Sequence, residues 1–243
     1  MQFTFKSYKN MLSNLEQNGY IITGYDNYRE NAKCAILRHD VDYDPQCAFE
    51  LSKLELMCNV KSTYFVLLSS DFYNCFSKKN IDIFKQIIEN GCEIGLHFDE
   101  AKYQELDNDI AKEIDYIQDE IEILSKVIGH PVKAVSMHRP SKKTLEANLK
   151  IPGVINSYSN EFFKEFKYIS DSRRRWREPI DDIINESKYD RLHILTHAFW
   201  YSEEELDITE KIRDFVEKGK YTRYDILNEN ITDLKDILRK EEL

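Results

Sequence analysis

The stretch that decides the fold is KCAILRHDVD, residues 33–42. Its first half is apolar without alternation, which is typical of a strand buried on both faces of a parallel sheet. Its second half, RHDVD at residues 38–42, is polar and follows directly at the carboxyl end of that strand. Binding and catalytic residues of parallel α/β proteins gather at this end of the strands. The stretch therefore predicts an α/β protein with a site at the carboxyl edge of its sheet.

Similar apolar runs recur along the chain and alternate with segments of helical periodicity. The longest helical pattern spans Tyr103–Ile128 and ends before Gly129. A strand–helix alternation predicts a parallel sheet, and the absence of a dinucleotide-binding glycine motif favours a closed or distorted barrel. The predicted strands are Lys33–Arg38, Lys61–Leu67, Cys92–Leu96, Val132–Ser136, Val154–Tyr158, Lys167–Ser170 and Arg191–Thr196.

The domain organisation predicted from the 243 residues is simple. No repeat, low-complexity tract or linker rich in Ser, Gly and Pro interrupts the chain, so we expect a single domain over residues 1–243. The polar strand ends fall within about residues 33–201, and residues 203–243 are expected to form C-terminal helices.

The composition argues against several classes of protein. A formal net charge of −10 repels a phosphate backbone, so we expect no nucleic-acid partner. No apolar run approaches the ~18 residues of a membrane span, and residues 1–20 carry no signal-peptide pattern. The five cysteines form no CxxC pair, which suits a reducing compartment. We therefore expect a cytoplasmic protein without a membrane span.

Histidines and aspartates cluster at the predicted strand ends. Four of the six histidines, His39, His97, His138 and His197, follow predicted strands. One carboxylate with two histidines is a common set of ligands for zinc or another transition metal. The alternative for the aspartates, a calcium loop or a solvated turn, is disfavoured because the glycine and distant glutamate of an EF-hand are missing.

Asp40 and Asp42 lie two residues apart and project to one face of an extended chain. Two carboxylates in one pocket need a cation to stay ionised, and Arg38 on the same face supplies part of that charge. A bound metal would supply more.

Several other polar residues have two interpretations each. His197 is either a general acid or part of an aromatic core corner, and Trp200 just after it is a candidate to contact substrate. Arg139 is either a clamp for a carboxylate or a surface charge. The run Arg173–Arg177 contains Trp176 and either stacks on a sugar or an anion or forms a solvated charge cluster.

The ordered segments RHDVD, EIGLH, HRP, DSRRRW and LTH resemble the motifs of the polysaccharide deacetylases, the family 4 carbohydrate esterases. The pattern looks closest to the divergent branch associated with surface-polysaccharide biosynthesis. The resemblance covers about Lys33 to Tyr201 and implies a single-domain distorted (β/α)7 barrel.

The resemblance implies a divalent metal, with zinc expected. Asp42 and His97 match metal ligands of the family, but Ala101 stands where a second histidine of the same motif is usual. His138, at the end of the neighbouring strand, is the expected third ligand, and Asp99 is the next candidate.

The resemblance also assigns roles around the metal. Asp40 matches the catalytic base and Arg139 the arginine that holds it. Asp171 and Trp176 match residues that line the substrate groove, and His197 matches the acid that protonates the leaving amine.

These roles imply a metal-dependent carbohydrate N-deacetylase. It would remove an acetyl group from an N-acetylated sugar in glycan or surface-polysaccharide biosynthesis, with a carbohydrate or nucleotide-sugar as its substrate. Three alternatives stay open: an inactive barrel that binds a glycan or nucleotide sugar, a metal-dependent phosphoesterase, and metal-free hydrolysis of a C–N bond with Asp40 as base. The sequence leaves the oligomeric state open.

Overall fold

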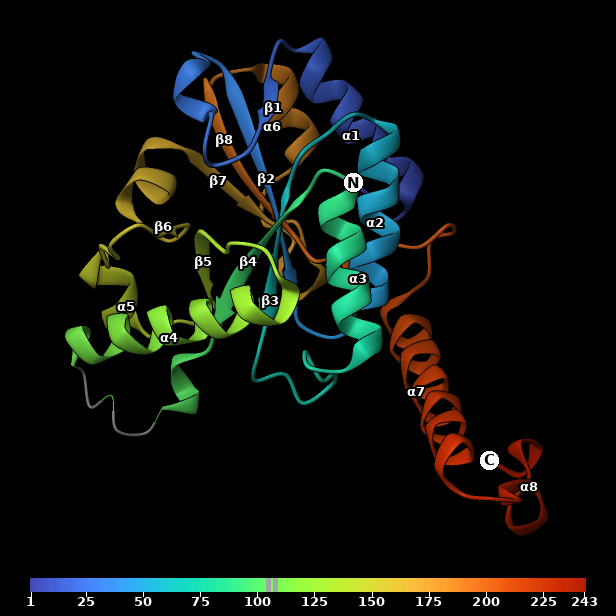
Figure 1. The fold of residues 1–243 in the computed structure, drawn as a ribbon. Helices are drawn as coiled ribbons and strands as arrows, with labels where there is room; N and C mark the ends of the chain where they lie inside the picture. Colours follow the sequence, from blue (N-terminus) through green and yellow to red (C-terminus); the bar gives the residue numbers. More distant parts are fainter. Residues whose placement is uncertain (104–105, 107–108) are drawn as a thin grey trace. The chain divides into compact units, whose positions relative to one another are not determined.

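The computed structural model describes residues 1–103, 106 and 109–243 and is drawn in Figure 1. It divides into two compact units, Met1–Glu203 and Glu204–Leu243. The first unit contains every described strand. The second contains helix α7 (Ile208–Asn230) and the short α8 (Leu234–Ile237), in agreement with the helices expected there. Among the described residues, no helix is both long enough and apolar enough to cross a lipid bilayer.

The strands of the first unit form one parallel sheet. Their order is β6-β5-β4-β3-β2-β8-β7, and β1 pairs with the first half of β2. The sheet curls into a half-barrel in which β6 and β7 are the two ends, since no ladder joins them among the described residues. The strands are β1 (Ile21–Thr23), β2 (Cys34–Val41), β3 (Thr63–Leu67), β4 (Glu93–Phe98), β5 (Ala134–Met137), β6 (Ile155–Asn156), β7 (Lys167–Ser170) and β8 (Arg191–Thr196).

This architecture confirms the predicted α/β class and its barrel-like curvature. All seven predicted strands are present, and β8 and β7 begin and end where the sequence placed them. The eighth strand, β1, was not predicted, because three residues are too few to carry a periodic pattern.

Helices cover the outside of the curled sheet (Figure 1). The expected helix from Tyr103 begins instead at Ile110, where the Asp109 side chain accepts two backbone N–H groups; positions 104–105 and 107–108 of that prediction lie outside the described residues. Its end is as predicted, at Gly129 with a left-handed φ of 69°. The helices are α1 (Phe5–Gln17), α2 (Pro45–Met57), α3 (Lys78–Glu89), α4 (Ile110–Ile128), α5 (Lys142–Ala147) and α6 (Ile180–Glu186).

Strand β2 is buried along its whole length, and its alternation decides which side chains reach the interior of the half-barrel. Cys34 and Ile36 pack in the interior aromatic cluster with Phe65. Arg38 and Asp40 continue the same face two and four residues further on, because successive side chains of a strand alternate between faces. The inner face of β2 therefore carries these two charged side chains toward the carboxyl end of the barrel.

Strand β4 can approach β3 closely only because it carries Gly95. A Cβ atom at this position would lie 2.5 Å from the ring of Phe65 and 3.1 Å from the carbonyl oxygen of Ala134. Two residues later the same strand presents His97. The glycine thus permits the tight packing beneath the end of β4.

Candidate active site

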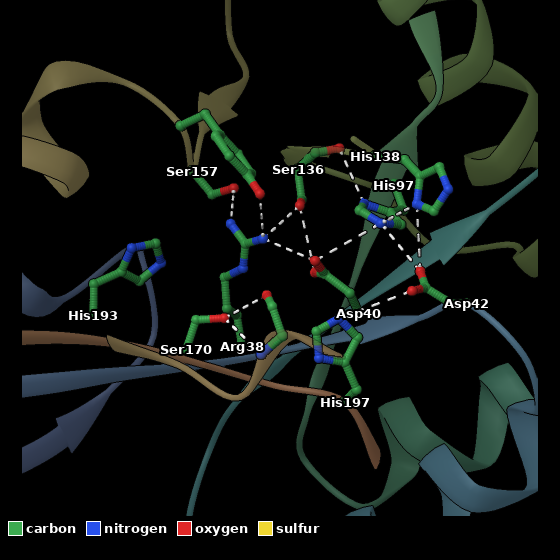
Figure 2. Close-up of polar contacts among 12 residues, drawn as sticks. Arg38, Asp40, Asp42, His97, Ser136, His138, Ser157, Ser170, His193 and His197 are labelled. Carbon is green, nitrogen blue, oxygen red and sulfur yellow. Dashed lines mark hydrogen bonds and ion pairs between the residues drawn. The ribbon is translucent and has the colours of Figure 1, made fainter. Parts of the chain in front are cut away.

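A cavity of about 690 Å³ opens at the carboxyl ends of the strands. Five of its lining side chains are acids or histidines that the sequence analysis selected. They come from the ends of β2, β4, β5 and β8, and Figure 2 shows them pointing toward one another: Asp40, Asp42, His97, His138 and His197.

Asp42, His97 and His138 form a compact cluster in which one potential ligand atom of each lies within 4.8 Å of the others. Asp42 Oδ1 lies 3.3 Å from His97 Nε2 and 3.5 Å from His138 Nδ1, and these two nitrogens are 3.1 Å apart. His97 Nδ1 lies 3.3 Å from the carbonyl oxygen of Ser136, which orients the ring so that Nε2 faces the cluster. The three side chains converge on one point.

This cluster fits a divalent cation. Asp42 Oδ1 is buried and has no well-aligned hydrogen-bond donor, and its charge faces the two imidazole nitrogens at 3.3 and 3.5 Å. Burial by itself raises the pKa of Asp42, but the contacts with His138 and His97 outweigh it and hold the pKa well below its ordinary range. An ionised carboxylate with two imidazoles suits zinc or another first-row metal and leaves positions for water and substrate.

Neither of the other positions considered for the third ligand belongs to the cluster. Asp99 uses its side chain to accept the backbone N–H of Ala101 at 3.1 Å, as the cap of a short 3-10 turn. Ala101 is exposed and offers no ligand atom. His138 takes the position next to His97 because β5 is the hydrogen-bonded neighbour of β4.

Asp40 lies beside the cluster and is paired with a fully buried arginine. Arg38 Nη2 donates to Asp40 Oδ2 at 2.9 Å and to Ser136 Oγ at 2.8 Å, and Nη1 donates to Ser157 Oγ at 2.7 Å. Burial favours the neutral acid, but the Arg38 guanidinium and His97 more than offset it and lower the pKa of Asp40. Asp40 is therefore an ionised carboxylate that lines the cavity and accepts a hydrogen bond from Arg38.

Arg139 was expected to hold Asp40, and the structure gives that position to Arg38. Within the described residues no hydrogen bond or ion pair joins Arg139 to Asp40. Arg139 lines the cavity with an exposed side chain and a left-handed φ of 47°. The Arg38 guanidinium contacts Asp40 because residues two apart on a strand project from the same face of β2.

His197 lies beside the cluster and is held by Asp171. Asp171 Oδ2 accepts the backbone N–H of His197 at 3.0 Å, and Oδ1 lies 2.6 Å from its Nδ1. Burial lowers the pKa of His197, but the carboxylates of Asp171, Asp42 and Asp40 outweigh it and raise that pKa to about 9. His197 Nε2 remains directed at the cavity, 3.8 Å from Asp42 Oδ2.

The aromatic and acidic residues expected to contact substrate divide into two groups. Trp200 lines the cavity, as predicted. Trp176 is half-buried and is not among the lining residues, and Asp171 is fully buried behind His197. Asp171 thus positions another side chain instead of lining the groove.

His39 was expected among the site histidines, but its side chain points to the other face of β2. Its ring lies 2.9 Å from Glu55 of α2 and 2.6 Å from Thr196, and it is fully buried. Strand alternation explains this position, because His39 lies between Arg38 and Asp40 in sequence.

Two partners of the site, Ser136 and Ser157, were not predicted, and both hold Arg38. Arg173 and Arg177 of the predicted arginine run line the cavity. Serines carry no charge pattern that distinguishes them in sequence, whereas the arginine run did point to this loop.

Neither a family model nor a curated protein matches the sequence. Several solved structures are similar in fold. A polysaccharide deacetylase from Bacillus cereus is 18% identical, with a TM-score of 0.46 over 77% of this chain and 89% of that one. A family 4 carbohydrate esterase from Bacillus anthracis is 20% identical, with a TM-score of 0.45 over 87% and 86%. A CE4 family pseudoenzyme from Bacillus anthracis is 16% identical, with a TM-score of 0.47 over 78% and 62%.

Proposed function

We propose that this protein is a metal-dependent hydrolase that removes the acetyl group from an N-acetylated sugar. One observation carries the proposal. A single cavity combines a cluster of possible metal ligands with an ionised carboxylate and a carboxylate-held histidine, both of which lie beside the cluster. Metal-assisted hydrolysis of an amide uses these three elements: an electrophilic centre, a base for water and an acid for the leaving nitrogen.

Asp42, His97 and His138 would hold the metal, and zinc suits their donor set. When bound, a divalent cation supplies Lewis acidity that polarises an acyl carbonyl and acidifies water. The backbone carbonyl of Ser136 orients His97 for this role.

Asp40 would be the general base. Its carboxylate accepts the proton of the water that attacks the acyl carbon. Arg38 fixes the carboxylate and keeps it ionised until it takes that proton. Ser136 and Ser157 complete the hydrogen bonding of the guanidinium, so its fork stays in place on the buried side of Asp40.

His197 would be the general acid. Asp171 fixes the ring through Nδ1, so Nε2 is the nitrogen that faces the substrate. As the C–N bond breaks, Nε2–H gives its proton to the departing amine. The products are acetate and an amino sugar, and the proton taken by Asp40 and the proton given by His197 balance the reaction.

The sugar would lie in the cavity against Trp200. An aromatic face suits the C–H face of a sugar ring, and the cavity volume of about 690 Å³ is in the range of ligand sites. We further propose that the reaction belongs to glycan or surface-polysaccharide biosynthesis in the cytoplasm.

The test is acetate release from N-acetylated sugars by the zinc-loaded protein, compared with Asp40→Asn. We expect release by the wild-type protein and its loss in the variant. Phosphate release from simple esters without acetate release would instead favour a phosphoesterase. Sugar binding without any turnover would favour a binding protein.

A further inference from the structure

Three arginines line the same cavity as the acids and histidines. Arg139 follows β5, and Arg173 and Arg177 lie in the loop after β7. All three side chains are exposed to solvent. The loops after β5 and β7, two strands that are far apart in the sheet order, therefore bring cationic side chains to one opening.

Among the residues that the structure describes, these arginines have no acidic partner. Within residues 1–103, 106 and 109–243, no carboxylate oxygen lies within 4.0 Å of a guanidinium nitrogen of Arg139, Arg173 or Arg177. This is notable in a chain with a formal net charge of −10, where acids outnumber bases. Both acids that line the cavity are otherwise engaged: Asp40 is paired with Arg38, and Asp42 lies among histidines. The positive charge of the rim is available to a ligand.

The backbone holds two of these arginines in an uncommon conformation. Arg139 has a φ of 47° and Arg173 a φ of 61°, both in the left-handed region that favours glycine. A residue with a Cβ atom costs free energy there, and such residues gather at functional sites. The backbone of the two loops is therefore less stable at Arg139 and Arg173 than it would be with a negative φ.

We propose that the substrate carries a negatively charged group, a phosphate or a carboxylate, that Arg139, Arg173 and Arg177 bind at the rim of the cavity. This inference rests on the proposed hydrolase function and narrows its substrate class to anionic N-acyl sugars. The guanidinium fork matches the oxygens of phosphate and carboxylate alike. A cationic rim also raises the local concentration of anionic ligands at this opening.

The test compares three probes that share an N-acetyl sugar and differ in charge. They are N-acetylglucosamine 1-phosphate, N-acetylmuramic acid, which carries a carboxylate, and neutral methyl N-acetylglucosaminide. Binding is measured by calorimetry and turnover by acetate release, with the zinc-loaded full chain at low salt. The variant is Arg139→Gln/Arg173→Gln/Arg177→Gln. Its matched control is Arg175→Gln, which removes one exposed charge from the same loop at a residue that does not line the cavity.

We expect at least one charged probe to bind more tightly than the neutral probe by about 10-fold or more, as for the loss of a hydrogen bond to a charged group. The preferred probe identifies phosphate or carboxylate as the anion. The preference should disappear in the triple variant and persist in Arg175→Gln. In the wild-type protein, the preference for the charged probe should also decrease as salt is added, because salt screens the arginine charges. This measurement tests the anion site without any substitution.

Equal binding of all three probes, or equal loss of the preference in Arg175→Gln, would overturn the inference. If the protein released acetate from all three probes with no preference for charge, the anion site would be refuted and the proposed hydrolase function would stand. Arginine-dependent binding of a charged probe without acetate release would support the anion site and contradict the hydrolase.

Discussion

Asp171 holds His197 at two points, through the backbone N–H with one carboxylate oxygen and beside Nδ1 with the other. The aspartate is fully buried, so solvent does not compete for either contact. Its two oxygens fix both the start of the segment after β8 and the orientation of the imidazole. The histidine is therefore oriented before any substrate arrives, and only Nε2 is left to act in the cavity.

Replacing Asp171 with Asn should lower the pKa of His197 from about 9, because it removes the first of the carboxylates that raise it. The fraction of protonated His197 at neutral pH then falls, and acetate release should slow by roughly 100-fold or more. NMR titration of the metal-free variant checks the pKa. Asp182→Asn, an exposed change on α6, is the control. An unchanged His197 titration would refute this relationship.

Removal of Arg38 should destabilise the fold strongly. The side chain is fully buried and neutralises Asp40, so Arg38→Met leaves a buried carboxylate without its partner, at a cost of about 3–5 kcal/mol. Urea denaturation measures the loss. The double variant Arg38→Met/Asp40→Asn should recover part of it, because the uncompensated charge is gone. If the single variant were as stable as the wild type, the ion pair would have no structural role.

Glu55 should make the stability depend on acid pH. It is fully buried and accepts hydrogen bonds from Tyr8, Ser62 and Tyr64 beside His39. Burial raises its pKa, but His39 and these donors outweigh it and lower the pKa. A lowered folded-state pKa means that the stabilisation is present above the ordinary glutamate value of about 4.3 and is lost as the pH falls through the lower folded value.

Glu55→Gln should therefore unfold at lower urea concentration than the wild type near pH 7, and the difference should shrink as the pH falls below about 4. Glu89→Gln, at an exposed position on α3, is the control and should match the wild type. A constant difference between Glu55→Gln and the wild type at every pH would show that the charge of Glu55 contributes nothing.

Gly95→Ala should destabilise the protein by about 1–3 kcal/mol, as overpacking of a well-packed core does. The added methyl group would lie 2.5 Å from the Phe65 ring, which cannot move freely because it is fully buried. Thermal denaturation measures the loss, and Gly95→Ala/Phe65→Leu should regain part of it. Full stability of the single variant would contradict the close approach of β3 and β4.

Much of this fold is predictable from the sequence, because each buried strand is an apolar run bounded by polar residues. β7 and β8 have the predicted bounds, whereas the three residues of β1 carry no pattern. The beginning of α4 was misplaced because its apolar spacing extends back past the cap at Asp109. Local periodicity finds elements better than it finds their ends.

The site was predictable in outline because parallel strands bring their carboxyl ends to one edge. The convergence of Asp42, His97 and His138 follows from the order of β2, β4 and β5 in the curled sheet. The expected contact between Arg139 and Asp40 is absent among the described residues, and Arg38 makes this contact instead. A single sequence does not show which side chains are close enough to meet across the barrel. The contact between Arg38 and Asp40 was predictable, because side chains two residues apart project from the same face of a strand.

The central claim is that Asp42, His97 and His138 hold a divalent metal. Elemental mass spectrometry of the purified protein tests it most directly, with Asp42→Asn, His97→Ala and His138→Ala as variants and the exposed His130→Ala as the matched control. We predict about one zinc or other transition-metal equivalent per chain in the wild type and the control, and its loss in each of the three variants. No bound metal in the wild type after dialysis against zinc, or equal metal content in all variants, would contradict the account.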